Sequence, residues 1–470
     1  MTKKKTKSYT KYRTLFLPKE MVDLLILKVN HVKLDIENNT LINIGLTVIN
    51  DILSKSNFYR DNIDYPFHVI PMDSRYLQLK YGNDYSKYIH WLKVNSIIWN
   101  DEPYEGRTTH FYLQDINTCN VMIESISKEF NLDVDSLIST YCLMNNTIIS
   151  TEYLDNKEIQ DDIKNRIYSK WYRIKLPITK QNKKYLTRDY EEDSKGINNA
   201  PAHIKKMGSH YRKNIDIDLQ GATTHAVNRY QGELNDAKSN DDEISAYKRY
   251  SSRIMSINSI KNGSNNKTLR FKRNKKNFRL DTNLTNMASD LRPYIIGYEN
   301  MSYLDLSNSQ PVLFNVLLKQ YQKDASEELK IELNKYFDIT TSGKWYEWLQ
   351  SVYNLSREEC KKIWMEIAYS KNHHHKQTKS KFSKEIPLIY DIIKNLKKEE
   401  HNQFAIHLQK VESKIFLDKI CKELVNEEII PYTMHDGLIV PKESRERTLE
   451  IMKDVLEKEI GIVPNIKVEN

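Results

Sequence analysis

Two aspartates in the C-terminal half of the sequence could hold divalent metal ions. Asp305 closes the segment Met301-Ser-Tyr-Leu-Asp305, and Asp436 stands between two apolar segments in Pro431-Tyr-Thr-Met-His435-Asp436-Gly437. Carboxylate oxygens are the ligands that Mg²⁺ prefers, and nucleotidyl transfer uses two such ions about 3.5–4 Å apart. A strand-end Asp305 facing a hairpin-tip Asp436 on one sheet would supply the converging carboxylates that this chemistry requires.

Each aspartate alone also fits an ordinary structural role. Asp305 could be a loop residue, and Asp436-Gly437 is a favoured hairpin turn. The adjacent His435 is less expected, because a hairpin tip does not need a His-Asp pair.

A third segment predicts a helix whose flank could bind a nucleoside triphosphate. Ser356 and Glu359 form a capping-box pattern, which predicts that the helix starts here. Four side chains then recur at every fourth position and would span about 18 Å along the helix flank; they are Arg357, Lys361, Met365 and Tyr369. The two cations suit phosphates, and the last two side chains suit a sugar and a base. The alternative is a solvated helix face with a chance period. The core face at helical spacing consists of Cys360, Ile363, Trp364 and Ile367.

The first half of the chain gives weaker signals. Residues 73–81 and 84–98 predict two short helices, and residues 99–114 predict a hairpin with a polar turn. This outline, about residues 64–115, resembles a winged helix, which would be either a DNA-binding module or a small structural domain. Further on, residues 244–257 predict a helix and residues 262–267 predict a linker.

Two charged segments flank the chemical segments. The basic run at 270–276 is interpreted as a phosphate contact because it leads into the Asp305 segment. The histidines at 373–375, with Lys376, Lys379 and Lys381, are interpreted as a polar loop that either faces nucleic acid or is simply exposed to solvent, and solvent exposure is favoured.

Composition narrows the class of protein. The 470 residues include 72 Lys plus Arg and 63 Asp plus Glu, and the net charge of +9 is compatible with a polyanionic partner. The four cysteines form no CxxC pair, which disfavours disulfides and zinc and favours a cytoplasmic location. The polar, basic start predicts no secretory signal, and no stretch approaches the roughly 20 apolar residues of a membrane span.

The C-terminal segments together resemble the family A DNA polymerases over about residues 266–470. The resemblance follows the order of the family's elements: Arg279-Leu280 and Asn283-Leu284-Thr285-Asn286, then Asp305-Leu-Ser307 with Gln310 (motif A), Arg357 to Tyr369 (motif B), Gln409 with Glu412, and His435-Asp436 (motif C). The resemblance implies an α+β, right-hand polymerase fold. Residues 266–320 and 401–470 would form the palm, residues 321–400 the fingers and residues 151–265 a thumb-like helical region. Residues 1–150 would form an accessory domain.

The resemblance also implies a role for each motif residue. Asp305 and Asp436 would bind two Mg²⁺ ions, with Mn²⁺ as a substitute. Arg357 and Lys361 would bind the triphosphate, and Lys361 would protonate the leaving pyrophosphate. The side chains that would contact the sugar and base of the nucleotide are Gln310, Met365 and Tyr369. Those that would contact the primer or the template are Arg279, Gln409 and His435.

Several positions depart from the family pattern. Gln310 replaces the Glu that blocks a ribose 2′-hydroxyl, Met365 replaces a Phe as in phage-type RNA polymerases, and Gly437 replaces the second acid of motif C. These changes predict that the enzyme would accept ribonucleotides or start chains without a primer. The compact motif A is similar to the polymerase-primases of staphylococcal cassette chromosome elements, which implies replication of a mobile element on single-stranded or primed DNA with a small accessory protein. The alternatives are a compact RNA polymerase and a non-catalytic, DNA-binding replication initiator.

Overall fold

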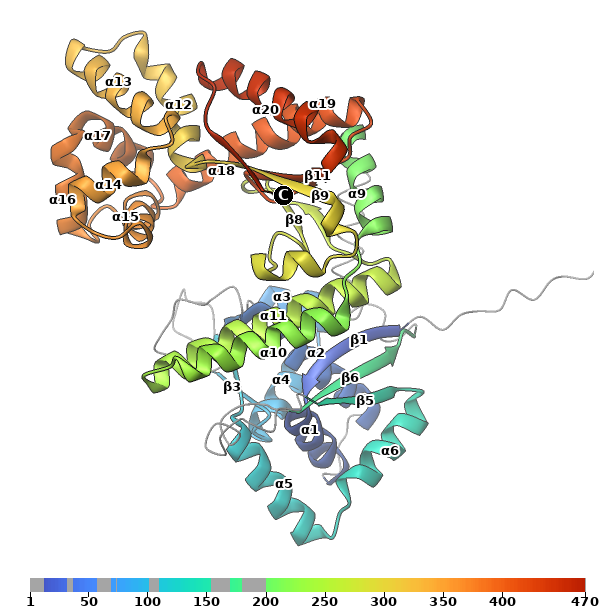
Figure 1. The fold of residues 1–470 in the computed structure, drawn as a ribbon. Helices are drawn as coiled ribbons and strands as arrows, with labels where there is room; N and C mark the ends of the chain where they lie inside the picture. The colour runs from blue at the N-terminus through green and yellow to red at the C-terminus, as the bar shows by residue number, and fades with distance from the viewer. Residues whose placement is uncertain are drawn as a thin grey trace, which may run out of the picture. The chain divides into compact units, whose positions relative to one another are not determined.

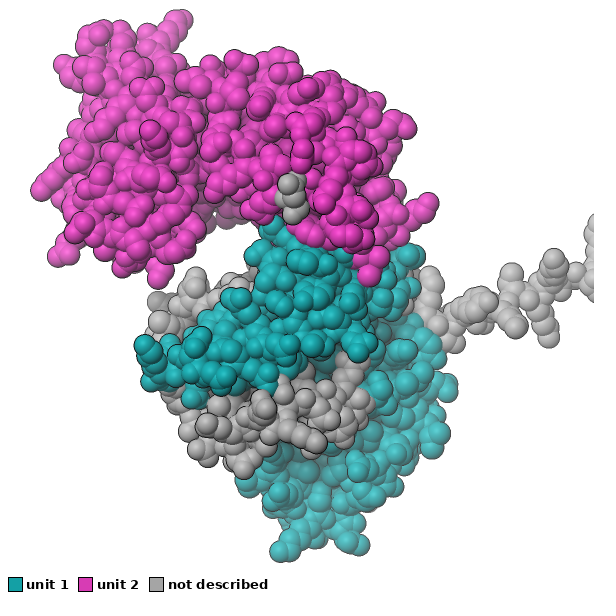
Figure 2. Space-filling view, in the orientation of Figure 1, with its two compact units in different colours: residues 1–192, 216–269, 287–295 teal, residues 193–215, 270–286, 296–470 magenta. Residues whose placement is uncertain are grey.

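The computed structural model describes residues 12–31, 37–56, 69–72, 74–100, 110–153, 170–179 and 200–469. The chain forms two compact units, each assembled from several stretches of sequence (Figure 2). Unit 1 comprises Met1–Glu192, Asp216–Leu269 and Met287–Ile295. Unit 2 comprises Asp193–Ile215, Arg270–Asn286 and Ile296–Asn470. Helices and small antiparallel sheets make up both units, which confirms the predicted α+β class.

Unit 1 contains a three-stranded antiparallel sheet in the order β1-β6-β5. Helix α1 follows β1 directly and is buried along nearly its whole length, because it packs against α2, α5 and α6. The elements of this region are β1 (Tyr12–Pro18), α1 (Lys19–His31), α2 (Asn38–Ser56), α5 (Ile116–Phe130), α6 (Val134–Asn145), β5 (Ile148–Tyr153) and β6 (Lys170–Pro177).

A second small sheet of unit 1 has the order β2-β4-β3 and is also antiparallel. The two helices expected in this region are confirmed, although the second ends at Val94 and not at residue 98. The tip of the expected hairpin lies outside the described residues. The elements are β2 (Val69–Pro71), α3 (Ser74–Tyr81), α4 (Tyr85–Val94), β3 (Ile98–Asn100) and β4 (His110–Leu113).

Helices α10 (Leu219–Asn235) and α11 (Asn240–Asn266) pack side by side and complete unit 1, with the 3-10 helix η1 (Ser289–Tyr294) against α10 (Figure 1). The expected linker at 262–267 is wrong, because α11 continues to Asn266. Gly263 serves close packing: a Cβ at this position would lie 2.8 Å from Cδ2 of Leu269. Lys267, the residue that follows the helix, caps it in a left-handed conformation.

Unit 2 is built on a four-stranded antiparallel sheet in the order β10-β11-β9-β12. Strand β9 is central and carries Asp305 near its end, as the sequence predicts. The strands are β9 (Met301–Leu306), β10 (Tyr432–Thr433), β11 (Gly437–Pro441) and β12 (Ile466–Glu469), and a separate hairpin joins β7 (Phe271–Arg273) to β8 (Leu280–Thr282). The accompanying helices are α9 (Ala202–Asn214), α18 (Gln403–Ile415), the π-helix η3 (Phe416–Ile420), α19 (Cys421–Asn426) and α20 (Arg445–Ile460), with short 3-10 turns η2 (Tyr298–Asn300) and η4 (Lys442–Ser444).

The remaining helices of unit 2 gather around an aromatic core in which Trp345 contacts Trp364 and Tyr336 (Figure 1). They are α12 (Ser309–Gln322), α13 (Glu327–Thr341), α14 (Trp345–Tyr353), α15 (Arg357–Tyr369), α16 (Lys376–Glu385) and α17 (Pro387–Leu396). In the part of the chain that the structure describes, no helix has the length and apolar character that crossing a membrane would require.

Candidate active site

The structure brings Asp305 and Asp436 together. Strand β11 pairs with β9 so that Gly437 lies directly opposite Asp305. The backbone N–H of Leu306 donates a hydrogen bond of 3.1 Å to the carbonyl oxygen of Asp436. Asp305 on β9 and Asp436, the loop residue just before β11, are therefore held close together by this pairing.

The electrostatics of Asp305 are those of a crowded acidic group. Burial raises the pKa of Asp305 to about 6, and the nearby charge of Asp436 adds to the rise. A hydrogen bond of 3.1 Å from the Tyr303 hydroxyl opposes the rise in pKa, as does the charge of Lys467, which lies opposite Asp305 on β12. A divalent cation between the two carboxylates would relieve the repulsion that raises this pKa.

The donor set fits a metal that takes further ligands from a substrate. Among the described residues, no group of three or more His, Cys, Asp or Glu side chains could enclose an ion. Mg²⁺ is commonly bound by one or two carboxylates together with water and substrate phosphates. The pair Asp305 and Asp436 fits that mode of binding.

The hairpin that carries Asp436 differs from the expected Asp-Gly turn. Its two loop residues are His435 and Asp436, closed by a 2.8 Å hydrogen bond from Met434 N to Gly437 O, and Gly437 belongs to β11. His435 adopts the left-handed φ of 64° that a glycine would adopt more easily. The reason for Gly437 is steric, since a Cβ there would lie 2.5 Å from the hydroxyl and ring of Tyr303. The alternative that Gly437 is present for its turn geometry is therefore not supported.

Helix α15 has the start and the core face that the sequence predicts. The capping box between Ser356 and Glu359 is formed in both directions. Cys360, Ile363, Trp364 and Ile367 are buried in the aromatic core. The opposite flank carries the expected row, in which Lys361 and Met365 are exposed and Arg357 and Tyr369 are half-buried.

The two cations of this row have only weak partners. Arg357 Nη1 lies 2.8 Å from Glu347 Oε1, and Lys361 Nζ lies 2.7 Å from Glu358 Oε1. All four side chains are more than a third exposed, and ion pairs of this kind contribute about 0–1 kcal/mol. Exchange of a glutamate for a phosphate group would therefore cost little.

Two side chains connect helix α12 to the end of α15. The Tyr369 hydroxyl donates a hydrogen bond to Oε1 of Gln310. Burial raises the pKa of Tyr369, so the phenol stays protonated and remains a donor. The structure thus joins the two positions that the sequence assigns to the sugar and the base.

Tyr346, on α14, was not identified from the sequence. The Arg357 guanidinium carbon lies 5.1 Å from the centre of its ring. Burial raises the pKa of Tyr346 to about 12, with smaller electrostatic effects from Arg357, Tyr369 and Asp436. Tyr346 therefore lies against one candidate phosphate-binding side chain, Arg357, although an isolated Tyr gives no signal in the sequence.

The residues expected to contact primer or template are held together by polar pairs. Arg279 Nε donates to Glu412 Oε1 at 2.8 Å, and Asn277 Nδ2 donates to Gln409 Oε1 at 3.0 Å. Burial raises the pKa of Glu412 to about 7, although the Arg279 guanidinium opposes this shift. These pairs fix the β7–β8 hairpin against α18.

His435 is the third member of the expected primer and template set. Its Nδ1 is buried without a hydrogen-bond partner among the described residues. Burial, followed by the charge of Arg279, lowers the pKa of His435. A neutral imidazole with one free nitrogen can accept or donate a hydrogen bond to a ligand.

The two charged segments outside the motifs differ from expectation. In the basic run, Arg273 makes two 2.7 Å hydrogen bonds to Asp418 and Arg270 pairs with Asp281, whereas Lys275 and Lys276 are exposed. The phosphate contact therefore stays a prediction, and it now depends on the two lysines.

The exposed polar loop expected beyond the three histidines is wrong for Lys379. This residue lies in helix α16 and is 2% exposed, and its ammonium donates to Ser370 Oγ at 2.6 Å. Lys397 likewise donates to Ile367 O at 2.7 Å. Two buried lysines therefore satisfy polar groups at the C-terminal end of α15, where cations are favoured.

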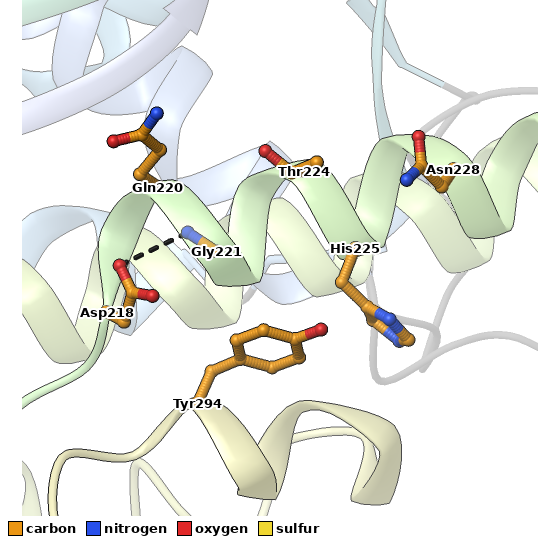
Figure 3. Close-up of a pocket in the computed structure, with 7 residues that line it drawn as sticks. All are labelled: Asp218, Gln220, Gly221, Thr224, His225, Asn228 and Tyr294. Carbon is orange, nitrogen blue, oxygen red and sulfur yellow. Dashed lines mark hydrogen bonds between the residues drawn. The ribbon is translucent and has the colours of Figure 1, made fainter.

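Unit 1 contains an open pocket beside the start of α10 (Figure 3). Asp218 caps this helix by accepting a 3.1 Å hydrogen bond from Gly221 N, and Tyr294 and His225 lie along one side. Because a carboxylate already occupies the helix N-terminus, the pocket is poorly suited to a phosphate. The other lining residues are Gln220, Thr224 and Asn228.

No family model and no curated protein matches the sequence. Among solved structures, the chain is similar to the POL domain of Pol1 from M. smegmatis in complex with DNA primer-template and dNTP. That match has 9% sequence identity and a TM-score of 0.39, and it covers 60% of this chain and 72% of that chain. A TM-score this low assigns neither fold nor function, so the interpretation of the site depends on its own residues.

Proposed function

We propose that this chain is a template-directed nucleotidyltransferase of the DNA polymerase kind. The observation that carries the proposal is the placement of Asp305, on β9, close to Asp436, in the loop that precedes β11. The row of α15 and the Gln310–Tyr369 pair support it, because the same unit then holds candidate ligands for metal, phosphate, sugar and base.

The proposed reaction joins the 3′-hydroxyl oxygen of a growing strand to the α-phosphorus of a nucleoside triphosphate. The bond from that phosphorus to the β-phosphate oxygen breaks, pyrophosphate leaves, and the hydroxyl proton passes to solvent. When bound, two Mg²⁺ ions would activate the attacking oxygen and stabilise the leaving group, and Mn²⁺ is an expected substitute. Asp305 and Asp436 would hold these ions.

Other side chains would position the triphosphate. Arg357 and Lys361 would exchange their surface glutamates for phosphate oxygens, and Lys361 would protonate the pyrophosphate. Met365 and Tyr369 would contact the nucleotide, and Tyr346 would hold the Arg357 guanidinium against its ring. Arg357 and Lys361 can leave their present partners because both ion pairs are exposed and weak. Tyr369 is half-buried and can keep a fixed place beside the nucleotide.

Arg279, Gln409 and His435 would contact the primer end or the template. The polar pairs of the β7–β8 hairpin with α18 support this role because they hold Arg279 and Gln409 in place before DNA binds. His435 supports it through its buried, unpartnered Nδ1. Pre-organised polar groups lower the cost of ordering a site on binding.

The finer assignment is a right-hand polymerase-primase that replicates a mobile element. In this assignment, α10 and α11 are the thumb-like helices, the four-stranded sheet is the palm, and the cluster from α13 to α17 is the fingers. Residues about 64–115 form a winged helix. Single-stranded or primed DNA is the template, and a small accessory protein is a partner.

A compact RNA polymerase is the second candidate. The 52% exposed Met365 favours it, because Met at this place resembles the phage-type RNA polymerases. A comparison of dNTPs and rNTPs on the same template, with and without a primer, separates the two candidates and tests for priming.

The direct test is Mg²⁺-dependent extension of a primed DNA template. We expect Asp305→Ala and Asp436→Ala to abolish extension while DNA binding persists. The matched control is Asp454→Ala, on the exposed face of α20, which should extend normally. Normal extension by either active-site variant would refute the site. Extension absent from the unmodified protein under all conditions would favour the replication initiator.

A further inference from the structure

Unit 1 contains a helix pair with the features of a helix-turn-helix. Helices α3 and α4 are separated by the three residues Gly82, Asn83 and Asp84. Gly82 has a φ of +94°, a conformation that favours glycine, and a Cβ at this position would meet no atom within 4 Å. The glycine therefore serves the turn itself. A three- or four-residue turn with a glycine is typical of the helix-turn-helix.

A buried polar cluster fixes α3 against α2. Lys80 Nζ lies 2.6 Å from Asp51 Oδ1, and both side chains are about 95% buried. The Tyr81 and Tyr76 hydroxyls donate to Asp51 Oδ2 at 2.8 Å and 2.9 Å. A buried ion pair with this many hydrogen bonds holds α3 in one orientation against α2, because loss of either partner would leave a buried charge. Helix α3 is therefore a supporting helix.

Helix α4 packs inward through one face only. Ile89, Trp91 and Leu92 are buried, and α4 contacts α2 and β3. The strand β3 then pairs with β4, which also pairs with β2. Along the chain the elements follow the order helix, strand, helix, helix, strand and strand (α2, β2, α3, α4, β3, β4). Helix α4 packs one face against α2 and β3, and the opposite face of α4 points outward.

The outward face of α4 is cationic and mostly polar, with Val94 as an exposed apolar side chain at its end. Its exposed side chains include Ser86, Lys87, His90 and Lys93, which share one face at helical spacing. The helix contains no Asp or Glu. Asp84, before the helix, lies 3.4 Å from Lys87, but both side chains are about 70% exposed and such a pair is weak. The charge of this face is complementary to a polyanion.

We propose that α4 is a recognition helix that enters the major groove of double-stranded DNA. The N-terminal part of such a helix contacts base edges, which assigns Lys87 and His90 to bases and Lys93 to a backbone phosphate. The ligand is internal duplex DNA, whereas the proposed polymerase site needs a strand end. This surface would hold the protein at a duplex site independently of the nucleotidyl-transfer reaction.

The test measures binding of the full-length chain to circular, covalently closed duplex DNA, which offers no strand end. We expect Lys87→Glu/Lys93→Glu to weaken binding at least about tenfold, and to reduce the slope of log K against log salt by about 2. The matched control is Lys128→Glu/Lys175→Glu, which reverses two exposed lysines on α5 and β6 of the same unit and should bind as the unmodified chain does.

Two further measurements keep the result interpretable. Equal melting temperatures of the two double variants show that both fold, and the milder Lys87→Gln/Lys93→Gln variant should give a smaller loss in the same direction. Binding of closed duplex that is unchanged in the α4 variants would overturn the proposal. So would an unmodified chain that does not bind closed duplex at low salt, where phosphate contacts are strongest.

Discussion

The Tyr303 hydroxyl donates a 3.1 Å hydrogen bond to Oδ1 of Asp305, two residues further along β9. The ring of Tyr303 lies against the backbone of Gly437, where any side chain would collide with it. Gly437 stands where the resemblance to the family A polymerases leads us to expect a second acid, and the ring of Tyr303 fills the space that its side chain would need. This tyrosine supports the first aspartate and does not add a third carboxylate.

Removal of the Tyr303 hydroxyl should change the pH dependence of the reaction. The hydrogen bond favours the ionised form of Asp305, whose pKa is already raised to about 6 by burial and by Asp436. We expect Tyr303→Phe to raise the pKa further, by about one unit for a bond of ordinary strength to a charged group. The acidic limb of the Mg²⁺-dependent extension rate should move to higher pH by that amount. A profile from pH 5 to 9 that superimposes on that of the unmodified enzyme would contradict the role of this bond.

Gly437→Ala should disturb the site through Tyr303. The added Cβ would lie 2.5 Å from the tyrosine ring, so either the ring or strand β11 must move. We expect a lower melting temperature, from a strain of about 1–3 kcal/mol, and a marked loss of extension. A double-mutant cycle with Tyr303→Ser isolates the clash, because loss of the buried ring is itself destabilising. Gly437→Ala should lower the melting temperature less in the Tyr303→Ser background than in the unmodified chain, and an equal loss in both backgrounds would show that the clash is not the cause.

Asp305→Asn should stabilise the protein when no metal is present. The pKa of Asp305 is raised from its usual value of 3.8 to about 6 in the fold, so its ionisation opposes folding above that pH and has no effect below pH 4. Two pKa units correspond to about 3 kcal/mol, which partial exposure reduces to on the order of 1 kcal/mol. The melting temperature in EDTA at pH 7 should rise by about 2 °C.

The pH and the metal both provide controls for this stability effect. The difference in melting temperature should close as the pH falls from 6 to 4, and saturating Mg²⁺ should stabilise the unmodified chain but not the variant. Asp454→Asn, at an exposed position of α20, should show neither effect. A lower melting temperature for Asp305→Asn at pH 7 would mean that the carboxylate is stabilised in the fold.

Local features of the sequence predicted local structure well. The capping box joins Ser356 to Glu359, and the apolar residues that follow recur every three or four positions. Both are local features, and both are present in α15. The end of strand β9 near Asp305 is also local. The proximity of Asp305 to Asp436 was predicted from the chemistry, because two metal ions need two converging carboxylates.

Contacts between distant segments were the features that the sequence did not predict. Asp436-Gly437 fits a hairpin turn, but at Gly437 the ring of Tyr303, far away in the sequence, approaches the backbone. Gly263 fell in an expected linker, but it packs closely against Leu269. Lys379 reads as a surface cation because burial of a lysine depends on acceptors elsewhere, here Ser370 and Lys371. The division of the chain into two interleaved units is likewise a property of packing and not of composition.

Gln310 should set how strongly the enzyme distinguishes ribonucleotides from deoxyribonucleotides. Its Oε1 accepts the Tyr369 hydroxyl, which leaves the amide nitrogen as a donor that can serve a ribose 2′-hydroxyl. A carboxylate at this position offers only acceptors and would hold the phenol more strongly. We therefore expect Gln310→Glu to lower kcat/KM for rNTPs by about tenfold relative to dNTPs, which corresponds to about 1.4 kcal/mol.

Single-nucleotide extension with matched dNTP and rNTP pairs measures this ratio. Gln322→Glu, at the exposed end of the same helix, should leave the ratio unchanged. An unmodified enzyme that already rejects rNTPs strictly, with no change in Gln310→Glu, would assign sugar selection to other residues, because the free amide would then have no ribose to accommodate.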